Sequence, residues 1–259
     1  INRTTTVGTA IIETVAGFGA AWFFLTRAVI AAFRPPWRLS LLFQQIYVIG
    51  VQSLSVIILV GAFTGAVLAV QGEYTLSKFG ADAFTGSAVA LSLIRELGPV
   101  LTALMVNGRA GSATTAELGI MKISEQVDAL RSMAIDPIHH LIVPRILAGV
   151  IAVPLLTAVF NVVGILGGYV VSVGTLGLSS GTFLSVMQQS VESIDVMSGL
   201  VKSVVFGLCI FWIACYKGWT CGFGAVGVNR ATTSAVVTAS SVILVLDYFL
   251  ASILTVLGN

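Results

Sequence analysis

Charged side chains inside long apolar stretches are the residues of this sequence with the clearest chemical potential. Arg95 and Glu96 are adjacent and stand between the apolar runs 91–94 and 97–100. A charge near the middle of a bilayer costs at least about 2.5–3.5 kcal/mol, so its side chain normally faces a cavity or a charged partner. Pro99 should loosen or kink the helix beside them. The pattern favours a segment that lines a pathway; an ion pair that locks two helices is the alternative.

Three further charges lie in or beside apolar stretches. Asp195 and Lys202 are seven residues apart, so they share one face of a helix that begins before Asp195. Lys202 has three open interpretations: it contacts a lipid phosphate, pairs with Glu96, or extends to the outer interface. Asp247 lies deep in the last apolar stretch, where a structural hydrogen bond and a transport role are both open.

Signatures of catalysis and metal binding are absent from the sequence. It contains no G-x-x-x-x-G-K-[ST] segment to hold ATP phosphates and no H-E-x-x-H zinc motif. His139 and His140 are adjacent, which is the wrong spacing for two ligands on one helix face. The three cysteines have no His or Asp clustered with them, which indicates small packing residues. We therefore expect no catalytic residue, no metal site and no cofactor in this chain.

The elements that position these residues are long apolar helices. Of the 259 residues, 57% are hydrophobic and 9% are charged, whereas a typical soluble domain has about 25% charged residues. No charge occurs between Arg38 and Glu73, or between Arg145 and Glu192. Runs of about 18 apolar residues are long enough to cross a bilayer. The sequence predicts an all-α polytopic membrane protein with five spans: Ile46–Val70, Gly86–Val106, Ile146–Gly174, Gly199–Tyr216 and Ala235–Leu257.

A sixth apolar stretch, Ile11–Phe33, has two interpretations. It is long enough to span, but it carries Glu13 and Arg27 near its ends and the aromatic residues Trp22, Phe23 and Phe24 between them. These features favour a helix lying in the membrane interface over a sixth span. We expect a single transmembrane domain over residues 1–259, with an interfacial helix and linker at 1–38 and a five-span bundle at 39–259.

The distribution of Lys and Arg predicts the orientation. With five spans, one side of the membrane receives Arg3, Arg27, Arg34, Arg38, Arg109, Lys122, Arg131, Arg145, Lys217 and Arg230. The other side receives Lys78 and several carboxylates. Because basic loops are retained in the cytoplasm, the N-terminus is expected there.

Two glycine motifs predict close helix packing. Gly61 and Gly65 are four residues apart, as are Gly164 and Gly168. Small residues at this spacing let helix backbones approach within lipid. The motifs favour a compact bundle or a dimer, without identifying the interface.

A short amphipathic helix is expected between two spans on the basic side, from Ser124 to Asp136. Ser124 is the expected N-cap, and Pro137 lies just past the end. Val127, Leu130 and Ala134 form one apolar stripe. Such a helix is suited to docking a cytoplasmic partner; a helix that only rests on the membrane is the alternative.

At these residues the chain resembles MlaE-type permeases of ABC transporters that move phospholipids in the Gram-negative envelope. The resemblance rests on the segments 90–100, 108–117, 125–137, 200–206, 227–233 and 258–259. It implies an interfacial helix plus five spans in a homodimer of the bacterial inner membrane, with a lipid cavity that opens outward. It also implies three protein partners: a cytoplasmic ATPase that binds ATP and Mg, an MCE-domain substrate-binding protein, and a STAS-domain protein. No nucleic acid partner is expected.

The resemblance also assigns residues to roles. It places Leu68, Gln71, Leu76, Phe79, Arg95, Glu96 and Lys202 in the lipid cavity. It places Asp195 and Glu192 in the outer part that faces the MCE protein. It makes the 124–136 helix the coupling helix, with Glu125, Asp128, Leu130 and Arg131 toward the ATPase. The implied function is phospholipid transport between the inner and outer membranes, which maintains outer-membrane lipid asymmetry; a stand-alone ion- or proton-coupled carrier is the alternative.

Overall fold

A computed structural model describes residues 3–33, 35 and 39–257, and all regular elements within these ranges are helices. The α-helices are α1 (Arg3–Ala32), α2 (Leu39–Ile49), α3 (Leu54–Leu76), α4 (Thr85–Ser92), α5 (Gly98–Val106), α6 (Ser112–Ile123), α7 (Gln126–Ser132), α8 (Val143–Gly174), α9 (Ser180–Ser190), α10 (Ser193–Trp219) and α11 (Gly224–Leu257). Short 3₁₀ segments are η1 (Val51–Ser53), η2 (Ser77–Phe79) and η3 (Asp82–Phe84). Wider π-helical turns are η4 (Leu93–Leu97), η5 (Asn107–Gly111) and η6 (Ile138–Ile142).

Five helical segments of the described chain are long and apolar enough to cross a membrane, which confirms the predicted fold class. They are Leu39–Phe79, Asp82–Ile123, Ile138–Gly174, Ser193–Trp219 and Gly224–Leu254. Each predicted span overlaps one of these segments, but the structural helices extend several residues beyond the predicted limits. The first is interrupted near Gly50, where α2 ends and η1 leads into α3. The second is interrupted twice, by η4 and η5.

The two glycine motifs pack against each other within one chain. A Cβ atom built on Gly65 would lie 1.7 Å from the carbonyl oxygen of Gly164, and one on Gly167 would lie 2.3 Å from the carbonyl oxygen of Ala62. Only residues without side chains permit this approach. The motifs therefore form the α3–α8 contact of a compact bundle, which is one of the two outcomes that their spacing allowed.

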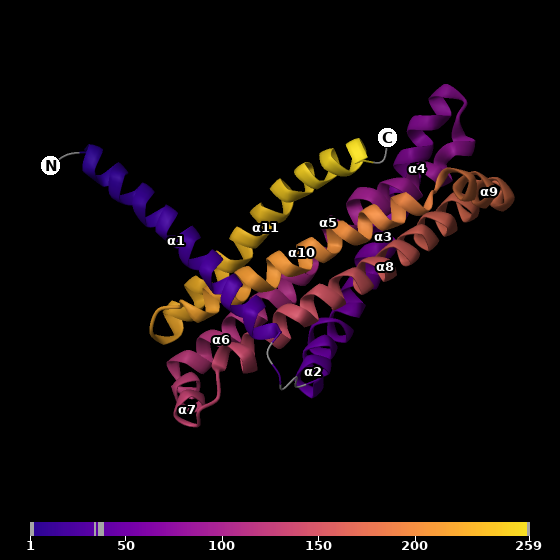
Figure 1. Cartoon of the computed structure of the whole chain (residues 1–259). Coiled ribbons are helices and arrows are strands. Elements are labelled where there is room, and N and C mark those ends of the chain that lie inside the picture. Colours follow the sequence, from indigo (N-terminus) through magenta and orange to yellow (C-terminus); the bar gives the residue numbers. More distant parts are fainter. Residues whose placement is uncertain (1–2, 34, 36–38, 258–259) are drawn as a thin grey trace.

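Helix α10 lies at the centre of the bundle, in contact with α8, α11, α6 and α5. Phe206, Ile210 and Phe211 on α10 are fully buried. The ring of Phe211 occupies the space that a side chain at Gly149 of α8 would need, because a Cβ there would lie 2.0 Å from the ring. Figure 1 shows α8 and α10 side by side along the length of the molecule.

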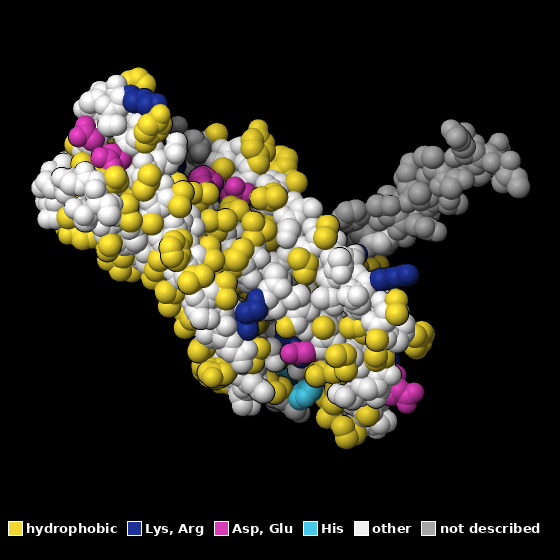
Figure 2. All heavy atoms as spheres, turned by 180° about the vertical axis from the view of Figure 1, so that it is seen from behind, with side chains coloured by type: hydrophobic (Ala, Val, Ile, Leu, Met, Phe, Trp, Pro, Cys, Tyr) yellow, Lys and Arg dark blue, Asp and Glu magenta, His cyan; other side chains and the backbone are white. Residues whose placement is uncertain are grey.

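The two ends of the bundle differ in the elements they carry. We call them the α7 end, with α7, η6 and the α10–α11 turn, and the α9 end, with α9 and the turns η2 and η3 (Figure 1). The face seen in Figure 2 is dominated by hydrophobic side chains between the two ends. An apolar belt between two more polar ends is what a membrane-spanning bundle requires.

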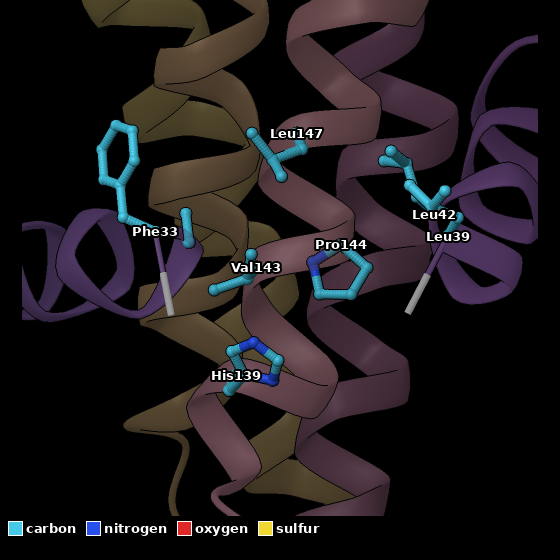
Figure 3. Close-up of a pocket in the computed structure, with 8 residues that line it drawn as sticks. Phe33, Leu39, Leu42, His139, Val143, Pro144 and Leu147 are labelled. Carbon is cyan, nitrogen blue, oxygen red and sulfur yellow. The ribbon is translucent and has the colours of Figure 1, made fainter. Parts of the chain in front are cut away.

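Helix α1 crosses the bundle obliquely at the α7 end (Figure 1). Its second half buries Phe24, Ala28 and Ala31 against the core. Within the part of this helix whose side chains the structure describes, Gly19–Ala32 is an apolar stretch. An apolar pocket of about 230 Å³ lies where α1 ends, between Phe33, the start of α2 and the start of α8 (Figure 3).

Candidate functional site

Five charged side chains from three elements form two ion-paired groups that are linked through the backbone of Arg95, and we call them together the network. Lys202 of α10 places its Nζ 2.5 Å from Glu96 Oε2 and 3.1 Å from Asp247 Oδ1 of α11. Arg95 Nε lies 3.4 Å from Asp195 Oδ1. Glu96 and Arg95 belong to the π-helical turn η4. The network therefore ties the second, fourth and fifth spans together through opposite charges.

The local sequence explains why Lys202 can enter this site. Pro99 has no backbone N–H, so the carbonyl of Arg95, four residues earlier, lacks its usual helical donor. Lys202 Nζ donates to that carbonyl oxygen at 3.1 Å. Gly199, one turn before Lys202, lets α10 approach the turn η4 closely, because a Cβ there would lie 2.2 Å from the carbonyl oxygen of Ile94. Proline, glycine and lysine thus form one packing unit.

The members of the network differ in exposure, and this divides their roles. Only 2% of the Lys202 side chain and 8% of the Asp195 side chain are exposed, against 46% for Arg95 and 47% for Glu96. Lys202 is the central cation, held by two carboxylates and one carbonyl, and it does not extend to the interface. Arg95 and Glu96 keep a free face that can contact a polar group of a ligand.

The network carries two positive and three negative side chains, a net charge of −1 if all five are ionised. Asp247 Oδ1 is within ion-pair distance of Lys202, but it makes no aligned hydrogen bond in the described structure. A buried ion pair gains little net stability, although removing one partner is strongly destabilising. The sequence alone left the role of Asp247 open; the structure places it beside Lys202.

The start of α10 is fixed by a reciprocal cap. The Glu192 side chain accepts from the backbone N–H of Asp195, and the backbone N–H of Glu192 donates to Asp195 Oδ2 at 3.0 Å. Two backbone donors at the helix start are satisfied in this way. Asp195 therefore lies inside, between the cap and Arg95, whereas Glu192 is exposed at the α9 end.

The other residues proposed to contact lipid lie on the outer part of α3 and the turn η2. Leu68 is half-buried against the core, and Leu76 is also half-buried. Gln71 and Phe79 are exposed. Among the described residues, no hydrogen bond or ion pair joins the side chain of Gln71 to Arg95 or Glu96. The structure thus places this set toward the α9 end without linking it to the network.

The short helix expected at 124–136 is present as α7 (Gln126–Ser132), but it starts differently from the prediction. The Ser124 hydroxyl donates back to the carbonyl of Ile120, and the N-cap position belongs to Glu125, which makes no side-chain cap. The prediction of a Ser124 cap was wrong because the serine closes the last turn of α6 instead. Glu125 itself adopts a left-handed conformation with φ of 59°, which redirects the chain into α7.

The predicted stripe of α7 is confirmed for two of its three members. Val127 is buried and Leu130 is half-buried, but Ala134 is exposed beyond the helix with φ of 57°. Glu125, Asp128 and Arg131 are exposed. Asp128 and Arg131 form an ion pair of 3.0 Å on the helix surface. The arrangement leaves charged groups of α7 available to a partner.

Sequence reasoning identified the segment around Arg109 but not the function of its side chain. Arg109 lies in the π-helical turn η5 and binds the break between α2 and α3. Its guanidinium donates to Ser53 Oγ at 2.9 Å, to Gln52 Oε1 at 3.3 Å and to the carbonyl oxygens of Val48 and Ile49. These carbonyls end α2 and lack helical donors, so a cation there is a helix cap. The only sequence feature that pointed to this capping role was a lone arginine next to a predicted span.

Within the described residues, no group of three or more His, Cys, Asp or Glu side chains could hold a metal ion. What remains is a charged network with two half-exposed members inside an apolar helical bundle, and a short helix with free charges at one end. This combination suits a membrane permease, a protein class that needs polar groups inside an apolar bundle and a contact surface at one end.

The chain belongs to the MlaE permease family, whose sequence profile, described as "Permease MlaE", matches residues 42–253. It is 45% identical over 255 residues to the intermembrane phospholipid transport system permease protein MlaE of Haemophilus influenzae, covering 98% of both chains. It is 43% identical to a probable ABC transporter permease protein of Rickettsia bellii, covering 96% of both. It is 38% identical to the chloroplast protein TRIGALACTOSYLDIACYLGLYCEROL 1 of Arabidopsis thaliana, covering 83% of this chain and 61% of that protein. The resemblance predicted from the sequence is confirmed.

Proposed function

We propose that this chain is the permease subunit of an ABC transporter that moves phospholipids between the inner and outer membranes and so maintains outer-membrane lipid asymmetry. The observation that carries the proposal is the end-to-end similarity to the Haemophilus influenzae protein, which its name assigns to intermembrane phospholipid transport. The chain acts as one permease domain over residues 1–259. It is a transport component, as its relatives named ABC transporter permeases are, and not an enzyme.

The charged network supports a role in holding a lipid headgroup. Arg95 and Glu96 are half-exposed, so the guanidinium and the carboxylate can meet a phosphate and an ammonium. Lys202 is buried and fixes the turn that carries them. Leu68, Leu76 and Phe79 offer apolar surface for acyl chains, and Gln71 offers a polar contact. Together they would form the lipid cavity.

Helix α7 is the proposed contact with a separate ATPase, which would bind ATP and Mg. Support comes from Glu125, Asp128 and Arg131, whose exposed charges can pair with a partner surface, while Val127 anchors the helix to the bundle. The half-buried Leu130 belongs to the same contact at its edge. Because the sequence contains no phosphate-binding loop of the Walker type, nucleotide hydrolysis is assigned to the partner.

The remaining assembly is proposed from the family resemblance. We place the chain in the bacterial inner membrane, with its N-terminus in the cytoplasm, as the excess of Lys and Arg at the α7 end supports. A homodimer is proposed, and the low burial of α11 supports a second copy covering part of that helix. An MCE-domain protein would meet the α9 end near Glu192 and Asp195, and a STAS-domain protein would bind the ATPase.

The experiment that tests the proposal is mass spectrometry of the protein purified in detergent after expression with its neighbouring genes. We expect a stoichiometric P-loop ATPase and bound phospholipid in the same complex. A lone protein without phospholipid would contradict the proposal and would favour an ion- or proton-coupled carrier built on Lys202, Glu96 and Asp247.

A further inference from the structure

A polar pocket lies at the α7 end, away from the network that contains Lys202. Its volume is about 250 Å³, and it lies between the second half of α1, the segment after α7, the start of η6 and the last turns of α10. Arg27 of α1 and Arg131 of α7 line it, together with Asp136, Tyr216 and Trp219. Neither the network nor the proposed lipid cavity includes this pocket.

The charges of the pocket are only partly compensated. Arg27 is exposed, and none of the ion pairs among the described residues includes it. Arg131 pairs with Asp128 at 3.0 Å and lies over the Trp219 ring at 5.8 Å. Asp136 uses Oδ1 to accept from the backbone N–H of Ile138 at 3.0 Å, and its other oxygen has no partner among the described residues. The pocket therefore presents a free guanidinium and a free carboxylate oxygen together.

The surrounding aromatic residues place the pocket at the depth of a membrane interface. Trp22 packs edge-on against Trp212 with a centroid distance of 6.2 Å, and Phe24 contacts both Tyr216 and Trp219. The indole N–H of Trp212 donates to the carbonyl of Ala21 at 3.0 Å. Tryptophan and tyrosine gather where acyl chains give way to headgroups. The pocket thus lies at the depth where a phospholipid in the leaflet on the α7 side presents its headgroup.

Apolar surface next to the pocket suits the rest of such a lipid. Ile138 of η6 lines the polar pocket, and the next residue, His139, lines the apolar pocket at the end of α1. Figure 3 shows this apolar pocket between Phe33, Pro144 and Leu42. Trp22 and Phe23 are also exposed on α1. Acyl chains therefore have apolar protein surface close to the charged groups.

We propose that the pocket between α1, α7 and α10 binds the headgroup of a membrane phospholipid that carries both a phosphate and a primary ammonium. The Arg27 guanidinium binds the phosphate, with Arg131 as a second donor, because guanidinium groups pair with phosphate oxygens in a bidentate way. The free oxygen of Asp136 accepts from the ammonium. A headgroup with phosphate alone would leave that carboxylate facing another negative charge.

This lipid is a structural ligand and not transported cargo. It would join α1 to α7, two helices that are far apart in the sequence and that both line the pocket. Its binding would therefore stabilise the position of the helix proposed to dock the ATPase. The inference stands separately from the transport role of Arg95 and Glu96, since it concerns other residues.

The test is native mass spectrometry of the complete complex after passage through nanodiscs that contain equal amounts of phosphatidylethanolamine and phosphatidylglycerol. We expect Arg27→Ala to lower the affinity for phosphatidylethanolamine at one site per chain by about tenfold, as loss of a charged hydrogen bond implies. Asp136→Asn keeps the oxygen that caps Ile138 but removes the charge, so it should abolish the preference for phosphatidylethanolamine. Arg230→Ala, which removes another exposed cation at the α7 end, is the control.

Three results would overturn the proposal. The first is unchanged lipid retention in Arg27→Ala, the second is equal retention of the two lipids by the wild-type complex, and the third is a loss of stability in Arg27→Ala without lipid. Thermal unfolding in lipid-free detergent separates a binding defect from a folding defect. The Arg27→Ala complex should unfold at the wild-type temperature there, and should lose only the stabilisation that added phosphatidylethanolamine gives to the wild type. A lower unfolding temperature without lipid would assign Arg27 to the fold and reject the site.

Discussion

Gly65 and Gly164 touch through their backbones: a Cβ on Gly65 would lie 1.7 Å from the Gly164 carbonyl oxygen. This contact joins the first and third spans without side chains between them. In a membrane, where apolar side chains gain nothing over lipid, such packing supplies much of the attraction between helices. A single added methyl group at the α3–α8 contact should therefore lower the stability of the bundle.

We expect Gly65→Ala to destabilise the protein by about 1–3 kcal/mol or more, because the added methyl group cannot be placed without separating α3 from α8. Thermal unfolding in detergent and the yield of monodisperse protein measure the effect. Gly174→Ala is the matched control, since a Cβ there meets no atom within 4 Å. Equal unfolding temperatures for the two variants would show that the helices adjust freely.

Replacing Lys202 should destabilise the bundle. Lys202→Met removes the cation held by Glu96 and Asp247 and leaves the Arg95 carbonyl without its donor. Breaking a buried ion pair from one side costs about 3–5 kcal/mol. We expect a lower unfolding temperature, with partial recovery in Lys202→Met/Asp247→Asn, because one uncompensated carboxylate is then neutral. Lys78→Met, at an exposed position, is the control; if it lowers the unfolding temperature as much, the network is not what holds these spans.

Arg95→Ala should affect the ligand more than the fold. Nearly half of the Arg95 side chain is exposed, so its removal leaves no large cavity, and the buried Asp195 keeps its hydrogen bond from the Glu192 backbone N–H. We expect the amount of phospholipid that co-purifies, or its transfer between vesicles, to fall severalfold while the unfolding temperature changes little. Lipid content and transfer both at wild-type levels would make Arg95 a structural residue.

How far the sequence predicts this site depends on the residue. Arg95 and Glu96 stand out because a charge in an apolar run is costly whichever way the helix is rotated about its axis. The contact of Lys202 with Glu96 was one of three open possibilities. For Asp247 the sequence identified no contact partner. Both depend on how α10 and α11 are rotated relative to η4. Periodicity within one helix cannot supply that rotation, since it says which residues share a face but not which neighbour that face meets.

The same limit explains the misassigned cap and the open glycine interface. Ser124 is a good N-cap by type, but a serine hydroxyl can also bond to the carbonyl four residues back, and here it does so. The left-handed turn at Glu125 that follows has no signature, because the residue is not glycine. The glycine motifs predicted close packing correctly, yet their spacing alone could not distinguish a partner helix in the same chain from one in a second copy.

Arg109→Lys should loosen the break between α2 and α3. The guanidinium reaches four acceptors on that segment, including two carbonyls that end α2. A lysine ammonium cannot reproduce this planar, branched arrangement. We expect faster hydrogen exchange of the backbone amides of residues 50–54, by about tenfold if one charged hydrogen bond is lost. Exchange elsewhere in the bundle should be unchanged, and wild-type protection at this segment would show that the arginine is dispensable as a cap.

Reversing the charges of α7 should separate the chain from its ATPase. Glu125, Asp128 and Arg131 are exposed on a helix bounded by left-handed residues at 125 and 134, so the backbone holds these charges in fixed positions. Because Asp128 and Arg131 pair with each other on the surface, reversing both keeps their local attraction while it inverts the charges that a partner meets. The reversal also removes the contact of Arg131 with Trp219, so Arg131→Ala alone, which should weaken lipid binding at the pocket between α1, α7 and α10 without abolishing co-purification, separates the two effects. We therefore expect Glu125→Lys/Asp128→Arg/Arg131→Asp to abolish co-purification of the ATPase while the permease remains folded and its self-association is unchanged. Glu73→Lys, at the α9 end, should leave co-purification intact. An ATPase that still co-purifies with the triple variant would exclude α7 as the docking helix and would point to the other surfaces of the α7 end.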